Sequence, residues 1–476
     1  MELAKSAKAN INYLAKIVYL KEFTPHPKPT VTRLKCATVD GFNILVGIDS
    51  QPGLYVYFPA GCMINPQLLS YNNLFRHSEL NANPQETGMF DDNGRVKAIK
   101  LQDFISEGFI LPADKLSNFI VSVTNKDIEL KDGTEFDCVK EGDKEFWINK
   151  KYVVHSHQSS SSEGRETGRG RKKKKRLSKV IDDQFRFHYD TMLIKKCPYV
   201  ITPDSMLHIS AKVHGTSGIS AYVQCRKHNA WHSKLFGWIW NNIWNRTINF
   251  FTNNNYHFNL DDRYYDYLYA SRTVIKNPDY NPTVTPGFYG VDIWKLADDI
   301  VRPKLDKGMT AYYEILGFLP TGQYIQKGFD YGYVPDTDLD HPYQYCRNFG
   351  IRIYRLTYTN VDGKVFEFSP RQVQIWSLEN GLMPVYEFYY GLAKDLYPDI
   401  PIDEHWNENF IERLSNDKNF YMEMDSPECR NKVPHEGIVI KIDNMKPAAF
   451  KLKCFRFLNK EQQALDKGES NIEDEA

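Results

Sequence analysis

The amino-terminal third of the chain alternates short apolar runs with polar turns. The apolar runs are Ala15–Leu20, Phe42–Gly47, Leu54–Phe58 and Val96–Leu101. Short β-type runs that are separated by Gly and Pro residues are typical of a small antiparallel barrel or sandwich. The pattern predicts an OB-like β-barrel module over residues 1–118.

The next part of the chain begins with the β-type run Phe119–Thr124 and then changes composition sharply. Between Ser156 and Lys179 it is rich in Ser, Gly, Arg and Lys, and residues 169–176 form a basic run. We expect residues 119–180 to be a connecting segment with a flexible loop. The basic run is compatible with a clamp on a phosphate backbone, with a nuclear targeting signal, or with an ordinary solvated loop.

Residues 181–458 mix helical and strand periodicity, which predicts an α+β domain. The apolar residues between Val291 and Lys307 share one helical face, and β-type runs lie at Met309–Phe318, Ile351–Thr359, Gly437–Ile442 and Ala448–Phe457. Residues 459–476 are expected to form a polar, acidic and partly disordered tail. The stretch from Trp231 to Trp244 is either an inserted flap that stacks on bases or a helix that buries its Trp side chains.

Composition narrows the class of protein. A chain of 476 residues exceeds what one core usually organises, and its 60 Lys+Arg balance its 60 Asp+Glu, which argues against a binder driven by overall charge. The eight cysteines form no C-x-x-C pair, so neither a zinc knuckle nor a disulfide framework is indicated, and a reducing compartment is expected. No apolar run suits a signal peptide or a membrane span. We expect a soluble cytoplasmic protein that has no membrane partner.

The candidate chemistry begins at Lys212, which opens the run Lys-Val-His-Gly at the end of the expected strand 207–211. A primary amine attacks a phosphate only when it is deprotonated, aimed by a tight turn and faced by cations. The glycine at position 215 allows such a turn. The alternative is an ordinary lysine before a turn at the end of a strand.

Further charged residues follow in an order that suits the same chemistry. Glu436 opens a β-branched strand, and Lys451 and Lys453 lie two positions apart on a later strand. Side chains two positions apart share one face of a strand, so both ammonium groups could meet one phosphate. The alternative for the lysine pair is a solvent-facing strand edge.

Together these residues resemble the ATP-dependent RNA ligases. That family belongs to the covalent nucleotidyltransferase superfamily, which also includes DNA ligases and mRNA capping enzymes. The matching segments appear in the family's order: the nucleotidyl-lysine motif at 212–216, the Ser-Arg element at 269–272, the central strand at 312–317, the base-stacking strand at 351–354, and the last two motifs at 436–441 and 451–453. The resemblance implies a ligase adenylation domain of antiparallel sheets with flanking helices.

A second likeness lies in residues 26–41, which resemble the entry to an OB-type module that one group of RNA ligases carries ahead of its catalytic domain. Compact DNA ligases and capping enzymes carry their OB domain after the catalytic motifs. About 20 residues follow Lys453, which is too few for such a domain. Two positions depart from the family pattern, since Tyr313 stands where Gly is frequent and Arg355 where an acidic residue is common.

The resemblance implies a mechanism. Lys212 would attack the α-phosphorus of ATP to form lysyl-AMP, AMP would pass to a 5′-phosphate, and a 3′-hydroxyl RNA end would displace it. A free lysine has a pKa near ~10.4, so Lys451, Lys453, a divalent metal and burial would have to lower it. Glu436 would help to hold Mg²⁺ or Mn²⁺.

The remaining roles follow from the same resemblance. Glu314 would bind ribose hydroxyls, Tyr354 would stack on adenine, and Arg272 would contact phosphate or the RNA end. The nucleotide site would also include His214, Gly215 and Lys441. The plainer alternatives are a strand carboxylate for Glu314, a core aromatic for Tyr354, a surface ion-pair partner for Arg272 and a turn-shaping residue for His214.

The expected function is RNA repair on RNA with 5′-phosphate and 3′-hydroxyl ends, with an end-healing kinase or phosphatase as a candidate partner. A DNA ligase or a capping guanylyltransferase shares the lysine chemistry and is the first alternative. The second alternative is a catalytically silent RNA-binding protein.

Overall fold

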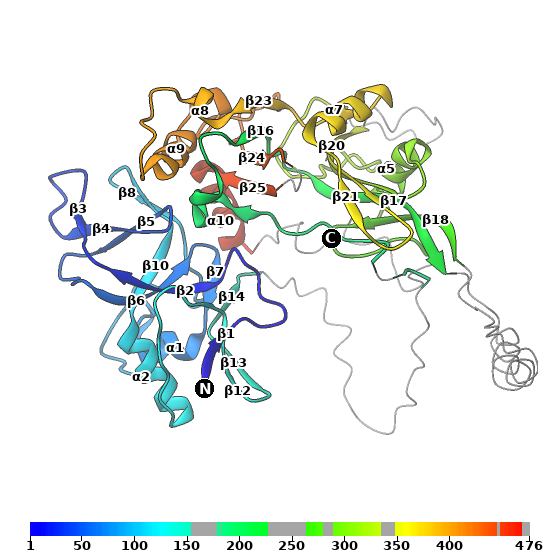
Figure 1. The fold of residues 1–476 in the computed structure, drawn as a ribbon. Helices are drawn as coiled ribbons and strands as arrows, with labels where there is room; N and C mark the ends of the chain where they lie inside the picture. The colour runs from blue at the N-terminus through cyan, green and yellow to red at the C-terminus, as the bar shows by residue number, and fades with distance from the viewer. Residues whose placement is uncertain are drawn as a thin grey trace, which may run out of the picture.

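The computed structural model describes residues 1–153, 179–181, 183–226, 263–278, 289–334, 348–444 and 448–468. The basic run 169–176 and the Trp-rich stretch 231–244 lie outside the described residues, so the expectations for them remain predictions. Figure 1 shows the amino-terminal part, in blue and cyan, beside a larger body that carries the rest of the chain.

The amino-terminal part is built from short, mostly antiparallel strands. One sheet has the order β10-β6-β2-β11, and smaller ones are β1-β12-β13, β3-β4-β5, β7-β14 and β8-β9. The bounds are β1 (Glu2–Ala4), β2 (Ala15–Leu20), β3 (Thr24–Pro25), β4 (Leu34–Val39), β5 (Phe42–Gly47), β6 (Gly53–Pro59), β7 (Cys62–Ile64), β8 (Ile99–Leu101), β9 (Phe104–Ser106), β10 (Gly108–Pro112), β11 (Glu135–Phe136), β12 (Cys138–Glu141), β13 (Lys144–Trp147) and β14 (Asn149–Lys151). Three of the expected runs are confirmed as strands β2, β5 and β6, whereas Val96–Leu101 is a strand only from Ile99 onward, as β8. A closed OB barrel stays a prediction.

Two helices, α1 (Pro66–Tyr71) and α2 (Ala113–Thr124), pack on these strands. The run Phe119–Thr124, which we expected to be β-type, is the second half of α2. Its Phe119 and Ile120 are buried in the core where α2 lies against β6 and β10, and this tertiary burial outweighs the β propensity of Ile and Val. The same core reaches Ile148, so the amino-terminal core extends beyond residue 118.

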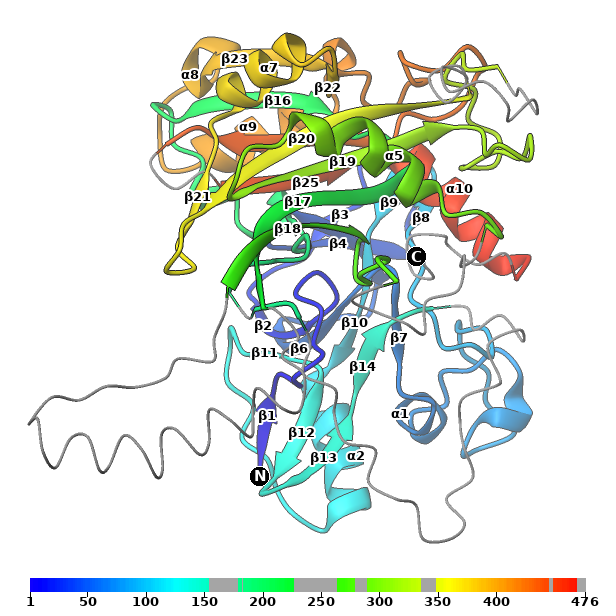
Figure 2. The ribbon, with the colours of Figure 1, turned by 90° about the vertical axis from the view of Figure 1, so that its right-hand side faces the viewer.

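The larger body contains two sheets that lie against each other, as Figure 2 shows. The first has the order β15-β25-β24-β16-β23 and the second has the order β18-β17-β19-β20-β21, with β22 beside β20. The bounds are β15 (Met192–Leu193), β16 (Met206–Ala211), β17 (Thr216–Arg226), β18 (Arg263–Ser271), β19 (Met309–Gly317), β20 (Phe349–Thr359), β21 (Val365–Glu367), β22 (Met383–Pro384), β23 (Glu387–Leu392), β24 (Gly437–Ile442) and β25 (Ala448–Lys453).

Helices flank both sheets, as the α+β pattern predicts. Helix α5 (Ile293–Val301) buries Ile293, Trp294, Ala297 and Val301 in the core of the second sheet, so its predicted apolar face is confirmed. Helix α7 (Pro370–Glu379) packs on the same sheet, and α8 (Ala393–Leu396) and α9 (Trp406–Ser415) pack on the first. None of the described helices has the length and apolar character that crossing a bilayer requires.

The carboxyl-terminal end differs from the sequence prediction. Strand β25 ends at Lys453, and residues from Phe455 to Asp466 form helix α10, where we expected a strand to 457 and a tail from 459. The carboxylate of Glu423 accepts hydrogen bonds from the backbone N–H groups of Phe455 and Arg456, two of the amides that a helix start leaves without partners. A distant residue therefore stabilises this helix, which local periodicity cannot reveal.

Candidate active site

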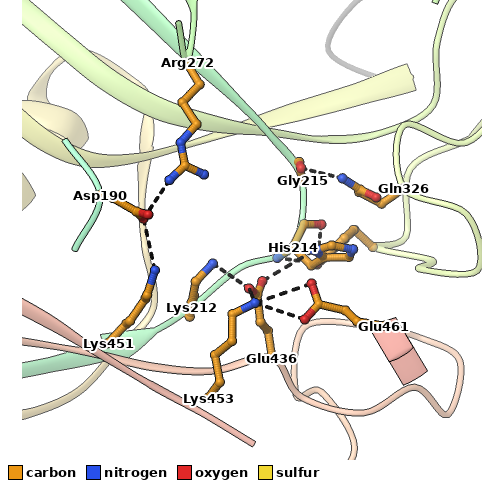
Figure 3. A network of polar contacts seen from close by, with 11 residues as sticks. Asp190, Lys212, His214, Gly215, Arg272, Gln326, Glu436, Lys451, Lys453 and Glu461 are labelled. Atoms are coloured by element: carbon orange, nitrogen blue, oxygen red, sulfur yellow. Dashed lines mark hydrogen bonds and ion pairs between the residues drawn. The ribbon is translucent and has the colours of Figure 1, made fainter. Parts of the chain in front are cut away.

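Lys212 lies in the short connection between the two sheets. Strand β16 ends at Ala211 in the first sheet, and β17 begins at Thr216 in the second. The backbone N–H of Lys212 donates to the carbonyl of Gly437 at 2.8 Å, which anchors the connection to the start of β24. The lysine is thus held where the sheets meet (Figure 3).

The turn after Lys212 is shaped by its neighbours. A Cβ atom on Gly215 would lie 2.4 Å from the carbonyl oxygen of Ile315, so no larger residue fits without a shift. The ring of His214 packs edge-on against Phe329 and Phe457, and its backbone carbonyl accepts a hydrogen bond from the Tyr331 hydroxyl at 2.9 Å. These contacts agree with the plainer alternative for His214, which is a residue that shapes the turn.

Glu436 is a buried carboxylate surrounded by cationic groups. Its Oε1 lies 2.6 Å from Nζ of Lys212 and 3.6 Å from Nζ of Lys453, and its Oε2 lies 3.5 Å from Nδ1 of His214. Burial alone would raise the pKa of Glu436, but the Lys212 charge, the His214 hydrogen bond and the Lys453 charge lower it to about 2. Glu436 is therefore ionised at neutral pH.

Lys451 and Lys453 project from the same face of β25, as the two-residue spacing predicted. The side chains on either side of them, Phe450 and Leu452, are buried in the opposite core. Lys451 pairs with Asp190 at 3.0 Å, and Lys453 pairs with Glu461 of α10 at 3.1 Å. Burial lowers the pKa of the Lys451 ammonium although Asp190 opposes this shift.

Two of these partners were absent from the sequence prediction. Asp190 lies between Lys451 and Arg272, whose guanidinium is 2.8 Å away, and Glu461 lies in the segment that we expected to be a disordered tail. Neither belongs to a matching motif. They reach the site only through the fold, because Asp190 precedes β15 and Glu461 lies on α10.

The other end of the cavity is aromatic and owes its shape to a β-bulge. Tyr312 pairs with Arg355 and Tyr313 pairs with Ile353, so Tyr354 is an extra residue in β20. Adjacent residues of a regular strand face opposite ways, and a bulge re-aims them. Both Tyr354 and Arg355 consequently line the same cavity.

Tyr354 is fixed by polar contacts at both ends. Its hydroxyl lies 3.1 Å from Oγ of Ser217, and its backbone carbonyl accepts a hydrogen bond from the Lys441 ammonium. Burial lowers the pKa of Lys441 to about 8. The ring of His188 lies edge-on to Tyr354, with 5.2 Å between the ring centroids.

The structure brings most of the predicted site residues into one cavity. Seven of them line it, namely Lys212, Arg272, Glu314, Tyr354, Lys441, Lys451 and Lys453. His214 and Glu436 line a smaller pocket on the other side of Lys212, and Gly215 lines neither. Side chains of the amino-terminal part, including Tyr13, Arg95 and Tyr152, complete the wall of the main cavity.

Glu436 is suited to a divalent cation that arrives with its own ligands. Among the described residues, no group of three or more His, Cys, Asp or Glu side chains is arranged to hold a metal ion. A hard cation at Glu436 would therefore take its other ligands from water and phosphate oxygens, as Mg²⁺ commonly does. A Mg²⁺ or Mn²⁺ ion that arrives with a nucleotide would need only one oxygen ligand from the protein, and the Glu436 carboxylate is the candidate for it.

No protein-family model and no curated protein matches this chain. Solved structures of the Naegleria gruberi RNA ligase do match: a variant with ATP and Mn (12% identity, TM-score 0.52) and a variant with AMP and Mn (13%, 0.51) each cover 94% of this chain and 99% of their own. An apo variant covers 95% of this chain and 99% of its own, at 14% identity and a TM-score of 0.52. The chain has the fold of these RNA ligases along nearly its whole length.

Proposed function

We propose that this protein is an ATP-dependent RNA ligase that joins a 5′-phosphate RNA end to a 3′-hydroxyl end through a lysyl-AMP intermediate. One observation carries the proposal: the amine of Lys212 shares a cavity with Lys451, Lys453 and the aromatic end at Tyr354. The likeness in fold to RNA ligase structures that contain ATP or AMP and Mn supports it.

In this proposal the nucleotide lies along the cavity with its base near Tyr354 and its phosphates near the lysines. Glu314, which lines the same cavity, would bind the ribose, and Lys441 would hold Tyr354 through its hydrogen bond to the backbone carbonyl. The amine of Lys212 forms a bond to the α-phosphorus, and the bond to pyrophosphate breaks. Lys451 and Lys453 offset the charge that develops on the phosphoryl oxygens.

Glu436 would hold Mg²⁺ or Mn²⁺, which would supply positive charge to the phosphate oxygens. In its described position Glu436 pairs with the Lys212 ammonium at 2.6 Å. The lysine must lose its proton and leave this pair before it can attack. His214 and Gly215 keep the backbone of Lys212 in place during that change.

RNA is the proposed partner, and the amino-terminal part would bind it. Tyr13, Lys151 and Tyr152 reach the cavity from that part of the chain, and such aromatic and basic side chains suit stacking and backbone contact. We propose the division of labour that the sequence suggested, with an RNA-binding module before a nucleotidyltransferase domain. RNA repair in the cytoplasm, with a kinase or phosphatase that prepares the ends, completes the proposal.

The first test is intact-mass and peptide mass spectrometry of the protein after incubation with ATP and Mg²⁺ or Mn²⁺. We expect AMP on Lys212 in the wild type and no adduct in Lys212→Met. An adduct with GTP instead of ATP would identify a capping enzyme, and no adduct with either nucleotide would identify a silent binding protein.

The second test separates an RNA ligase from a DNA ligase. Matched nicked duplexes that carry either ribose or deoxyribose at the 3′ end of the nick are incubated with the enzyme and ATP. We expect faster sealing of the ribose-terminated nick. Equal or faster sealing of the deoxyribose-terminated nick would contradict the RNA assignment.

A further inference from the structure

Asp190 is an anion built into the phosphate end of the cavity. Its Oδ1 lies 3.0 Å from Nζ of Lys451 and 2.8 Å from the Arg272 guanidinium (Figure 3). Asn10 of the amino-terminal part donates a hydrogen bond to its Oδ2 at 2.9 Å. One carboxylate oxygen therefore occupies the place between two cations that a phosphoryl oxygen would suit.

The backbone around Asp190 is fixed while its side chain remains partly accessible. Asn12 donates to the carbonyl of Thr191 at 3.0 Å and accepts from the N–H of Leu193 at 2.9 Å, and Leu193 pairs with Lys451 across β15 and β25. The Asp190 side chain is 27% exposed. Rotation of the Asp190 side chain is therefore enough to free the position between Lys451 and Arg272, and β15 does not have to move.

The charge of an incoming ligand decides whether such a replacement is favourable. An internal phosphodiester of RNA carries one negative charge, so its exchange for the Asp190 carboxylate gains little. A terminal phosphoryl group carries about −1.5 to −2 at pH 7 and gains from both cations. Lys451 and Arg272 are mostly shielded from solvent, where salt screens such differences least.

We propose that Asp190 sets a charge threshold for the Lys451–Arg272 pair: it yields to a terminal phosphoryl group and keeps out internal phosphodiesters. Asp190 thus lowers the affinity of the pair for every anion by a similar factor, so that only the more strongly held terminal phosphoryl group still binds. The terminal phosphoryl group belongs either to the polyphosphate of the nucleotide or to the 5′-phosphate end of RNA. This inference rests on the proposed function, because it assumes that the cavity binds phosphorylated substrates.

The test compares two small anions that differ in charge, methyl phosphate and dimethyl phosphate, by ³¹P NMR titration of the full chain. In the wild type we expect methyl phosphate to bind and dimethyl phosphate to bind at least about tenfold more weakly. In Asp190→Asn, where no carboxylate has to leave, we expect both affinities to rise by a similar factor of about ten. Dimethyl phosphate would then bind measurably.

Other results would overturn the proposal. A loss of both affinities would mean that Asp190 only holds the cations in position. A gain for methyl phosphate far larger than that for dimethyl phosphate would mean that the carboxylate stays in place and acts through its field. Unchanged affinities would mean that the anions bind elsewhere.

A matched control removes one negative charge at another point of the same cavity. Glu107→Gln breaks the 2.6 Å ion pair of Glu107 with Lys195 and leaves Lys451 and Arg272 untouched. We expect its anion affinities to stay within about twofold of the wild type. If Glu107→Gln raised the anion affinities as much as Asp190→Asn does, the cause would be the net charge of the cavity, and the proposal for Asp190 would be wrong. Thermal unfolding of both variants confirms that each is folded during the titrations.

The source of the phosphoryl group is identified with pyrophosphate and with a 5′-phosphorylated RNA oligonucleotide. The ligand whose affinity rises in Asp190→Asn by the factor measured for methyl phosphate uses the cation pair. If neither affinity rises, the pair does not serve a substrate and the proposal fails. None of these titrations requires lysyl-AMP, so a missing adduct would overturn the proposed ligase activity and leave the threshold standing.

Discussion

The position of the Lys212 amine depends on residues that have no reactive group of their own. Gly215 lets the turn pass beneath β19, and Tyr331 and Gly437 hold the backbone on either side. Glu436 then holds the amine itself. At the scale of single residues, several neighbours therefore fix the position of the Lys212 side chain, and each of them can be tested by a separate substitution.

Gly215→Ala tests the turn. The added methyl group would lie 2.4 Å from the Ile315 carbonyl oxygen, so the turn must shift. We expect a loss of stability of about 1–3 kcal/mol from the crowding and a roughly 100-fold slower adduct formation with ATP, because a displaced nucleophile loses alignment. Gly47→Ala is the control, since nothing lies within 4 Å of its added methyl group. An active Gly215→Ala variant would contradict the assigned role of the turn.

The Glu436 carboxylate makes stability depend on pH. Its pKa is about 2 in the folded chain, below the ordinary value near ~4.3, so it contributes stability above that value and loses the contribution as pH falls toward 2. The contribution is on the order of 3 kcal/mol. We expect Glu436→Gln to be less stable than the wild type in urea unfolding at pH 6, with a smaller difference at pH 3. A difference that stays constant between these pH values would show that the charge of Glu436 does not stabilise the fold.

At the scale of elements, the bulge in β20 decides which aromatic ring faces the cavity. Tyr354 and Arg355 both reach the cavity because Tyr354 is the inserted residue. Base stacking on an aromatic ring contributes roughly 1–3 kcal/mol. We expect Tyr354→Ala to weaken ATP binding by roughly 5- to 150-fold, measured by titration calorimetry.

Tyr354→Phe is the matched control for the stacking prediction. It keeps the ring and removes only the hydroxyl that lies 3.1 Å from Ser217. The loss of one such hydrogen bond costs about 1 kcal/mol, so we expect an affinity within about fivefold of the wild type. If Phe and Ala weaken binding equally, the hydroxyl and not the ring is the important group.

The elements also show how far the sequence could be used. The alternation of Phe450, Lys451, Leu452 and Lys453 fixes one face of β25, and the face is as predicted. The run Phe119–Thr124 is as rich in β-branched residues as a strand, yet it lies in α2 because its Phe119 and Ile120 complete a core with β2 and β6. Contacts with segments far away in the chain decide such cases, and a local pattern does not contain them.

The candidate site, too, was predictable from the sequence only in part. Lys212, Arg272 and the lysines of β25 stand in recognisable motifs, and the structure places them in one cavity. Asp190 and Glu461 belong to no motif. Each carboxylate joins the site only because the fold brings Lys451 or Lys453 close to it, and the local sequence does not show this. The bulge that turns Arg355 into the cavity is equally invisible in the sequence, since it depends on the register between β19 and β20.

At the scale of the whole molecule, α10 joins the amino-terminal part to the cavity. One side of the helix carries Glu461, which pairs with Lys453 at 3.1 Å. Another carries Gln462, which exchanges hydrogen bonds of 2.8 and 3.1 Å with the backbone of Ala98, and Asp466, which pairs with the buried Arg95. The part of the chain that we expected to be a tail therefore forms one of the contacts between the two halves of the molecule.

Gln462→Ala tests whether that contact serves RNA more than ATP. The change removes two hydrogen bonds and leaves the backbone of Ala98 without them, which costs about 1–2 kcal/mol and weakens the contact 5- to 30-fold. The lysines, Glu436 and Tyr354 belong to the larger body, so the rate of adduct formation with ATP should change by less than about threefold. Sealing of a nicked RNA duplex by the pre-formed adduct should become about 5- to 30-fold slower.

Gln463→Ala provides the matched control, because Gln463 is the adjacent residue of the same type and its side chain is exposed. It should leave both steps unchanged in single-turnover assays. Equal losses of adduct formation and sealing in Gln462→Ala would mean that the amino-terminal part supports the nucleotide cavity directly, which the contacts of Asn10 with Asp190 would then explain. A selective loss of sealing would assign α10 the task of holding the RNA-binding part over a cavity that is already able to react with ATP.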